Sequence, residues 1–262
     1  MTSTICKLGW TFVVLVSILT RGVMAQEAPG DRVERILTDL ERRSDGLRDI
    51  RCRVRYVEDD RINLTKRTKT GSILFQIVEP NPRFLIQFDQ TVTDDILGKR
   101  EWYLFDGRWL SEAVERVQQV TRREIVRPGE KIDLFDLETA PFPLPFGQKK
   151  ETILRNFEVQ LVAPTDGDPK NADHLVCIPK PESPLYGEYD QLDFFVHKEI
   201  HLPIRIVVTR NKGLEINTAD FPDLSEKSIN TGVTRKDFTA PSAWKKYKVV
   251  VEELAPVGES AP

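Results

Sequence analysis

Apolar side chains occupy every second position from Ile73 to Ile77 and again from Phe84 to Phe88, and a Pro-Asn-Pro sequence separates the two runs. A period of two, with β-branched and aromatic residues, predicts two strands. The two prolines cannot donate hydrogen bonds to a strand ladder, so the chain is expected to turn between the runs.

A second hairpin is predicted between Trp102 and Leu110. Asp106-Gly107 separates two apolar segments there. Asp-Gly favours a tight turn between antiparallel strands because such turns need residues that accept positive φ.

Residues 47–57 form the first expected strand, and its two faces differ. One face is apolar and consists of Ile50, Cys52, Val54 and Tyr56. The other face consists of Arg51, Arg53 and Arg55. We interpret the arginine face as solvated, because charge on an exposed strand discourages aggregation. An anion or headgroup site is the alternative.

Further strands outnumber helices along the chain. They are expected at 116–126, 157–163, 174–179, 191–196, 204–210, 213–217 and 248–251. Helices are expected at 31–43 and 149–156, the first with an apolar stripe that must pack against the sheet. The pattern predicts a mostly β (α+β) fold.

The N-terminal 25 residues have the features of a cleavable signal peptide. Lys7 precedes the apolar segment 12–19, and Val23-Met24-Ala25 is a small-residue cleavage pattern. We expect export to the periplasm, a single domain over 26–252 and a disordered tail over 253–262. The net charge of −3 argues against nucleic acid as a partner class.

This series of elements resembles the LolA-type outer-membrane lipoprotein carriers, and more narrowly a bacterial LolA-like branch of unassigned role. The resemblance rests on a short helix, the strands around Gly71 and the Pro-Asn-Pro-Arg-Phe sequence, the Asp-Gly hairpin, and Asp237-Phe238 followed by Pro241 and Trp244. It implies a curled antiparallel half-barrel with helices packed on or across its open side. It also implies a monomer without cofactors that holds acyl chains of lipoproteins or lipids.

Candidate cavity residues are the apolar residues of the expected strands. They are Phe75, Phe84, Ile86, Phe88, Trp102, Leu104, Phe194 and Ile206. A proline-rich segment, 139–147, alternates proline with bulky apolar residues, which favours an extended loop. The candidate lid residues come from this loop and the first helix. They are Ile36, Leu40, Phe142, Leu144 and Phe146. Ordinary core packing is the alternative for each residue of both sets.

Two other functions remain open. An RseB-like envelope sensor would use the same fold to bind a protein partner without lipid transport. A hydrolase would need a spatially assembled site, because no nucleophile, P-loop or zinc motif is present. His197 and His201 are predicted to lie in a turn and not to bind metal. Cys52 and Cys177 are either a disulfide or two buried thiols.

Overall fold

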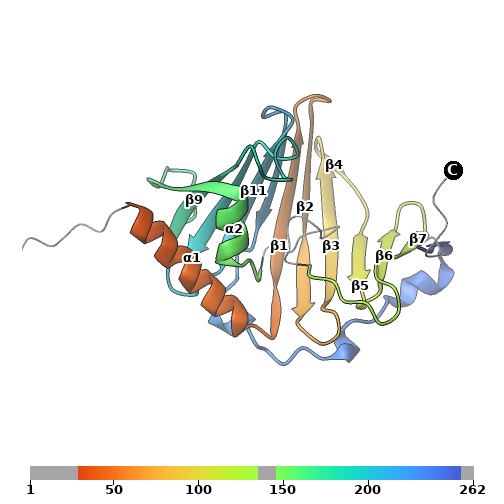
Figure 1. Ribbon diagram of the computed structural model, residues 1–262. Coiled ribbons are helices and arrows are strands. Elements are labelled where there is room, and N and C mark those ends of the chain that lie inside the picture. Colours follow the sequence, from red (N-terminus) through yellow and green to blue (C-terminus); the bar gives the residue numbers. More distant parts are fainter. Residues whose placement is uncertain (1–28, 135–145, 255–262) are drawn as a thin grey trace, which may run out of the picture.

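The structure is a computed structural model that describes residues 29–134 and 146–254. One sheet of 13 strands dominates it (Figure 1). The strands are β1 (Asp49–Asp60), β2 (Thr65–Gln76), β3 (Arg83–Thr93), β4 (Ile96–Leu97), β5 (Glu101–Phe105), β6 (Trp109–Val114), β7 (Gln119–Glu124), β8 (Phe157–Val162), β9 (Ala172–Pro179), β10 (Gln191–His197), β11 (Pro203–Arg210), β12 (Glu215–Asp220) and β13 (Lys248–Glu252).

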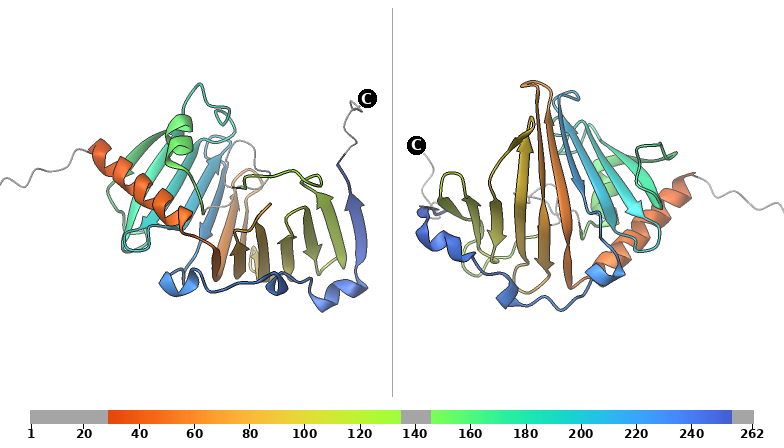
Figure 2. Two further views of the ribbon diagram at one scale, coloured as in Figure 1. Left: turned by 60° about the horizontal axis from the view of Figure 1, so that its bottom comes forward. Right: turned by 180° about the vertical axis from the view of Figure 1, so that it is seen from behind.

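The sheet curls but does not close. Its strand order is β13-β7-β6-β5-β3-β2-β1-β12-β11-β10-β9-β8, and β4 pairs with β3 off this path. Figure 2 shows the curvature from two further directions. All neighbouring strands are antiparallel except β13, which pairs parallel with β7. The curled half-barrel is therefore confirmed, with one parallel strand at its edge.

Local sequence explains the two best predicted turns. β2 ends before the Pro-Asn-Pro sequence, where the buried Asn81 side chain donates to the carbonyl of Gly107 at 2.9 Å and accepts from the amide of Ile132 at 2.9 Å. Gly107 has φ +101° and is the first central residue of the next hairpin. The Asp106 carboxylate accepts the Trp109 amide at 2.8 Å and closes that turn.

Gly71 permits a close approach of β2 to β3. A Cβ atom on this residue would lie 1.8 Å from the carbonyl oxygen of Gln87. The pairing of the two strands shifts at this point, leaving Asp89 as an extra residue in β3. The bulge bends β3 and so contributes to the curvature of the sheet.

Two helices pack on the concave face at the β8 end of the sheet. They are α1 (Pro29–Asp45) and α2 (Lys150–Asn156). Leu37 of α1 and Ile153 of α2 are fully buried with Leu175 and Phe194 of the sheet. Both helices were expected, and neither helix in the described parts of the chain has the length and apolar character needed to span a membrane.

The chain after β12 runs below the sheet to its convex face (Figure 2). It contains three short 3₁₀ helices, η1 (Glu226–Ser228), η2 (Arg235–Asp237) and η3 (Ser242–Lys246). Val233, Phe238 and Trp244 of this segment pack on Leu85 and Trp102. The convex face of β3 and β5 is therefore covered by the C-terminal segment.

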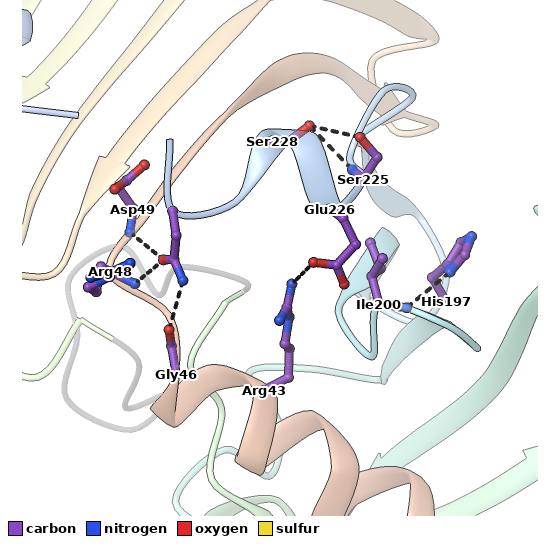
Figure 3. Close-up of polar contacts among 10 residues, drawn as sticks. Arg43, Gly46, Arg48, Asp49, His197, Ile200, Ser225, Glu226 and Ser228 are labelled. Carbon is purple, nitrogen blue, oxygen red and sulfur yellow. Dashed lines mark hydrogen bonds and ion pairs between the residues drawn. The ribbon is translucent and has the colours of Figure 1, made fainter. Parts of the chain in front are cut away.

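Asn230 joins α1, β1 and this C-terminal segment. Its side-chain oxygen accepts the amide of Arg48 at 2.7 Å, and its nitrogen donates to the carbonyl of Gly46 at 3.1 Å. Arg43 pairs nearby with Glu226 at 2.6 Å (Figure 3). These contacts attach the end of α1 to the start of β1 and to the C-terminal segment.

Cys52 and Cys177 are both buried and free, which is the second of the two states expected from the sequence. Burial raises the pKa of the Cys52 thiol to about 12, and burial also raises the pKa of the Cys177 thiol. On the opposite face of β1, Arg51 pairs with Asp237 at 3.1 Å and Arg55 with Asp220 at 3.1 Å. Both arginines thus form ion pairs with carboxylates of this chain.

Candidate functional site

The concave face contains a groove of about 630 Å³. This volume lies within the usual range for small-molecule sites, about 300–1,000 Å³. Its walls come from β7, β10 and the strands that lie between these two in the sheet, and from Phe157 at the start of β8. The apolar and aromatic lining residues are Val54, Tyr56, Ile73, Phe84, Ile86, Phe88, Tyr103, Leu110, Ile125, Phe157, Tyr189, Leu192, Phe194, Ile206, Val208, Ala219 and Phe221.

Strand register explains why these side chains meet. Ile86 lies opposite Ile73 on one side and Tyr103 on the other, and all three line the groove. Farther along the sheet, Phe194 lies opposite Ile206. Directly paired residues of adjacent strands share a face, so each lateral row adds to one apolar wall.

Five of the eight candidate cavity residues line this groove. They are Phe84, Ile86, Phe88, Phe194 and Ile206. Phe75 is on the same face, opposite Phe84, but it is fully buried below the groove. These six residues thus lie on the groove side of β2, β3, β10 and β11.

The placement of Trp102 and Leu104 was wrong. Both belong to the cluster on the convex face, where the C-terminal segment covers them. Tyr103 and Phe105 of the same strand face inward, because they lie opposite Ile86 and Phe84. β5 has large apolar side chains on both faces, so alternation alone could not decide which pair points into the groove.

The candidate lid residues are core residues where the structure describes them. Ile36 and Leu40 are buried in the packing of α1 against the sheet and are not among the lining residues of the groove. Phe146 is fully buried, with its ring 4.9 Å from that of Phe221. Phe142 and Leu144 lie outside the described residues, so their proposed role is a prediction.

Charged side chains gather at one end of the groove. Lys69, whose side chain is only 6% exposed, pairs with Glu101 at 3.0 Å and with Glu58 at 3.3 Å. Its ammonium group also lies 5.5 Å from the centre of the Phe88 ring. The two carboxylates offset part of the cost of burying this lysine.

Other polar groups at this end of the groove are paired as well. Arg123 donates to Glu112 at 2.8 Å, and Tyr103 donates to Glu101 at 3.3 Å. Burial, followed by the nearby Glu101, raises the pKa of Tyr103, so its hydroxyl is protonated at neutral pH. The end of the groove is thus polar but internally balanced.

Lys69 was missed by the sequence analysis, although its position carried a usable signal. It lies four residues before Ile73, and Gly71 lies between them, so strict alternation places Lys69 on the inner face of β2. It lies opposite Tyr56, which the sequence did assign to the apolar face of β1. A basic residue that alternates in phase with the apolar positions of a strand therefore indicated a charged group inside the groove.

The histidines lie elsewhere. His174 has Nε2 2.9 Å from Asp193 and Nδ1 3.3 Å from Asp168, and its ring stacks on Phe195. In a hydrolase triad one ring nitrogen would face a nucleophile, whereas here both face carboxylates. His197 accepts the amide of Glu199 at 3.2 Å within the expected turn. No group of three or more potential metal ligands occurs in the described residues.

Comparison with known proteins finds similarity to solved structures. No protein-family model matches the chain, and no curated protein matches it. An uncharacterized conserved protein from Thermus thermophilus is 12% identical with a TM-score of 0.43, covering 84% of this chain and 99% of that one. A chain of the MucA/MucB complex of Pseudomonas aeruginosa is 14% identical with a TM-score of 0.44, covering 81% of this chain and 62% of that one.

A LolA superfamily protein from Nitrosomonas europaea is 12% identical with a TM-score of 0.34, and the match covers 79% of this chain and 97% of that one. The solved structures to which the chain is similar thus include a LolA superfamily protein. At these identities and TM-scores the similarity carries no conclusion about ligands or partners.

Proposed function

We propose that the protein is an exported carrier that holds acyl chains of lipids or lipoproteins in the concave groove. The observation that carries this proposal is the continuous apolar wall that runs from β3 across β2, β1, β12 and β11 to β10 and includes Phe84, Ile86 and Phe194. An acyl chain is a suitable occupant because each buried methylene contributes about 0.8 kcal/mol.

The packing around the groove supports an open site. Ile86 is only partly buried although it lies in the middle of the sheet. Phe75 and Phe105, in contrast, are fully buried beneath it. A groove with a packed floor and partly accessible walls can receive an apolar guest without first opening the core.

Several parts of this proposal concern residues that the structure does not describe. Residues 1–25 would be the signal peptide that directs the chain to the periplasm, and Phe142 and Leu144 would shield the bound chain. The protein would act as a monomer and without a cofactor. The charged end around Lys69 would face the polar part of the guest.

The test is mass spectrometry of lipids extracted from the protein as purified from its native envelope. We expect a stoichiometric acylated species, and we expect the emptied protein to take up a fluorescent fatty acid. Protein that is empty on isolation and also fails to take up the fatty acid would contradict the carrier proposal.

The open edge strand β13 supports a second candidate function, that of an envelope interaction module. Val249 and Val251 are 54% and 53% exposed on this strand. An edge strand can pair with a segment of another protein. Recovery of a specific envelope protein with lipid-free protein, lost on substitution of Val251 by proline, would favour this function over the carrier.

A further inference from the structure

Three hairpin tips at one end of the sheet expose large apolar side chains. Ile62 and Leu64 lie between β1 and β2, Ile96 and Leu97 form β4, and Leu214 lies between β11 and β12. These side chains are between 44% and 87% exposed. The tips stand at the top of the sheet in Figure 1, away from α1 and the C-terminal segment.

Backbone hydrogen bonds join the three tips into one row. The amide of Arg61 donates to the carbonyl of Leu214 at 2.8 Å, which links the central tip to the β11–β12 tip. On the other side, the amide of Asp94 donates to the carbonyl of Lys66 at 3.3 Å, and the Asp94 carboxylate accepts the amide of Lys66 at 3.2 Å. The apolar side chains are therefore presented together.

Turn geometry does not account for Leu64 at the central tip. Leu64 has φ +53°, a conformation that glycine or asparagine adopts more easily than leucine. Its side chain is also 87% exposed, so burial does not stabilise it. An apolar residue that is favoured neither by its backbone nor by the core is one that an external apolar phase would stabilise.

The charged end of the groove lies toward the same end of the sheet. Its charged wall residues Glu58, Lys69 and Arg210 lie a few positions before or after the tips on the same strands. Its other end is closed by Phe75 and Phe105, which are fully buried. A bilayer in contact with the tips would thus lie beside the polar end of the groove.

The charges around the tips indicate what kind of surface they fit. Residues 59–67, 93–97 and 210–215 contain five basic and five acidic side chains. A balanced set has no net attraction to an anionic surface, and apolar contact must then supply the binding energy. The protrusion of single apolar side chains on convex turns suits insertion between lipid headgroups better than it suits a flat protein interface.

We propose that this row of tips is a membrane-docking surface that inserts Ile62, Leu64 and Ile96 into the interface of a zwitterionic bilayer. The proposal goes beyond the carrier function and does not require a lipid in the groove. It assigns the tips a separate role, which is to hold the charged end of the groove near the membrane.

The test is flotation of the purified protein with phosphatidylcholine vesicles, comparing the wild type with an Ile62→Ser/Leu64→Ser/Ile96→Ser variant. We expect the wild type to float with the vesicles, and we expect the variant to bind at least about tenfold more weakly. Because the tips carry balanced charge, raising the salt concentration or adding phosphatidylglycerol should leave wild-type binding unchanged.

A Val249→Ser/Val251→Ser variant is the control, because it removes apolar side chains that are 54% and 53% exposed from a distant edge strand. It should float like the wild type, and since all three proteins have the same N-terminus, any contribution from residues 12–19 cancels.

Absence of wild-type binding, equal loss in both variants, or binding that requires anionic lipid would overturn the proposal. An Ile86→Trp variant should still float, so failure of the carrier proposal can be told apart from failure of this one.

Discussion

Trp244 meets Trp102 edge to face on the convex side of the sheet, with ring centroids 6.4 Å apart and ring planes at 77°. Trp102 is 2% exposed although its strand has no other layer of the sheet behind it. The C-terminal segment therefore supplies the second layer that buries the outer face of β5.

Trp244→Ala should lower the free energy of unfolding by about 3 kcal/mol, because it leaves Trp102 uncovered and removes a buried aromatic side chain. Urea denaturation would measure the change. Lys245→Ala, in the same 3₁₀ helix but exposed, should change stability by no more than about 0.5 kcal/mol. Equal stability of the two variants would contradict the covering role of Trp244.

Ile86→Trp should fold and lose acyl-chain affinity by at least about tenfold, because the larger ring would fill a groove that is now open. Fluorescent fatty-acid titration would measure the affinity and thermal unfolding the stability. If the site were packed core, the same change would instead destabilise the protein by about 1–3 kcal/mol.

Ile178→Trp is the matched control for this change. Ile178 is also in the sheet, but it is 36% exposed and alternates with the inward-facing Cys177. The control should keep both stability and acyl-chain affinity. Unchanged stability and unchanged binding in Ile86→Trp itself would show that Ile86 does not line an acyl site.

Lys69→Met should destabilise the protein by about 2 kcal/mol, because Glu58 and Glu101 would then face each other without the cation between them. Adding Glu101→Gln to the Lys69→Met variant should recover part of the lost free energy of unfolding. A double-mutant cycle, measured by urea denaturation, would give the coupling of the two residues. Purely additive effects would mean that the ion pair contributes nothing to the stability of this end of the groove.

Stability should decrease as the pH rises above 9. The pKa of Cys52 is raised by burial from 9.0 to about 12, so the folded thiol keeps its proton at a pH where the unfolded thiol loses it. The folded state then binds more protons than the unfolded state, and the stabilisation present below pH 9 is lost as the pH rises. Cys177 acts in the same direction.

Free energies of unfolding measured between pH 8 and pH 10 would show this decline. In a Cys52→Ala/Cys177→Ala variant the decline over this range should be smaller. The comparison is best made below pH 10, because buried Tyr56 and Tyr103 add the same trend above their ordinary value of 10.0. A variant as pH-sensitive as the wild type would rule out the thiols as the cause.

Local pattern was sufficient for the strands whose two faces differ in polarity. β1 has apolar residues on one face and arginines on the other, and β3 places Phe84, Ile86 and Phe88 on one face. In such strands a shift of one residue would expose the apolar set, so alternation determines the inward side chains. The turns at Asn81 and Gly107 were predictable for an equally local reason, since proline and glycine restrict the backbone there.

Other features depended on which segments meet in space. Trp102 and Tyr103 are both large and partly apolar, and only pairing with Ile86 and cover by Trp244 decide which of them faces the groove. The ion pairs of Lys69 also depended on the tertiary structure, because its two carboxylate partners come from β1 and β5. The sequence by itself determined the strands, the turns and the apolar face of most strands, because these follow from backbone geometry and side-chain alternation. Only the tertiary structure decided the extent of the groove, the charged cluster at its end and the row of exposed hairpin tips, because each is assembled from strands that are distant in the chain.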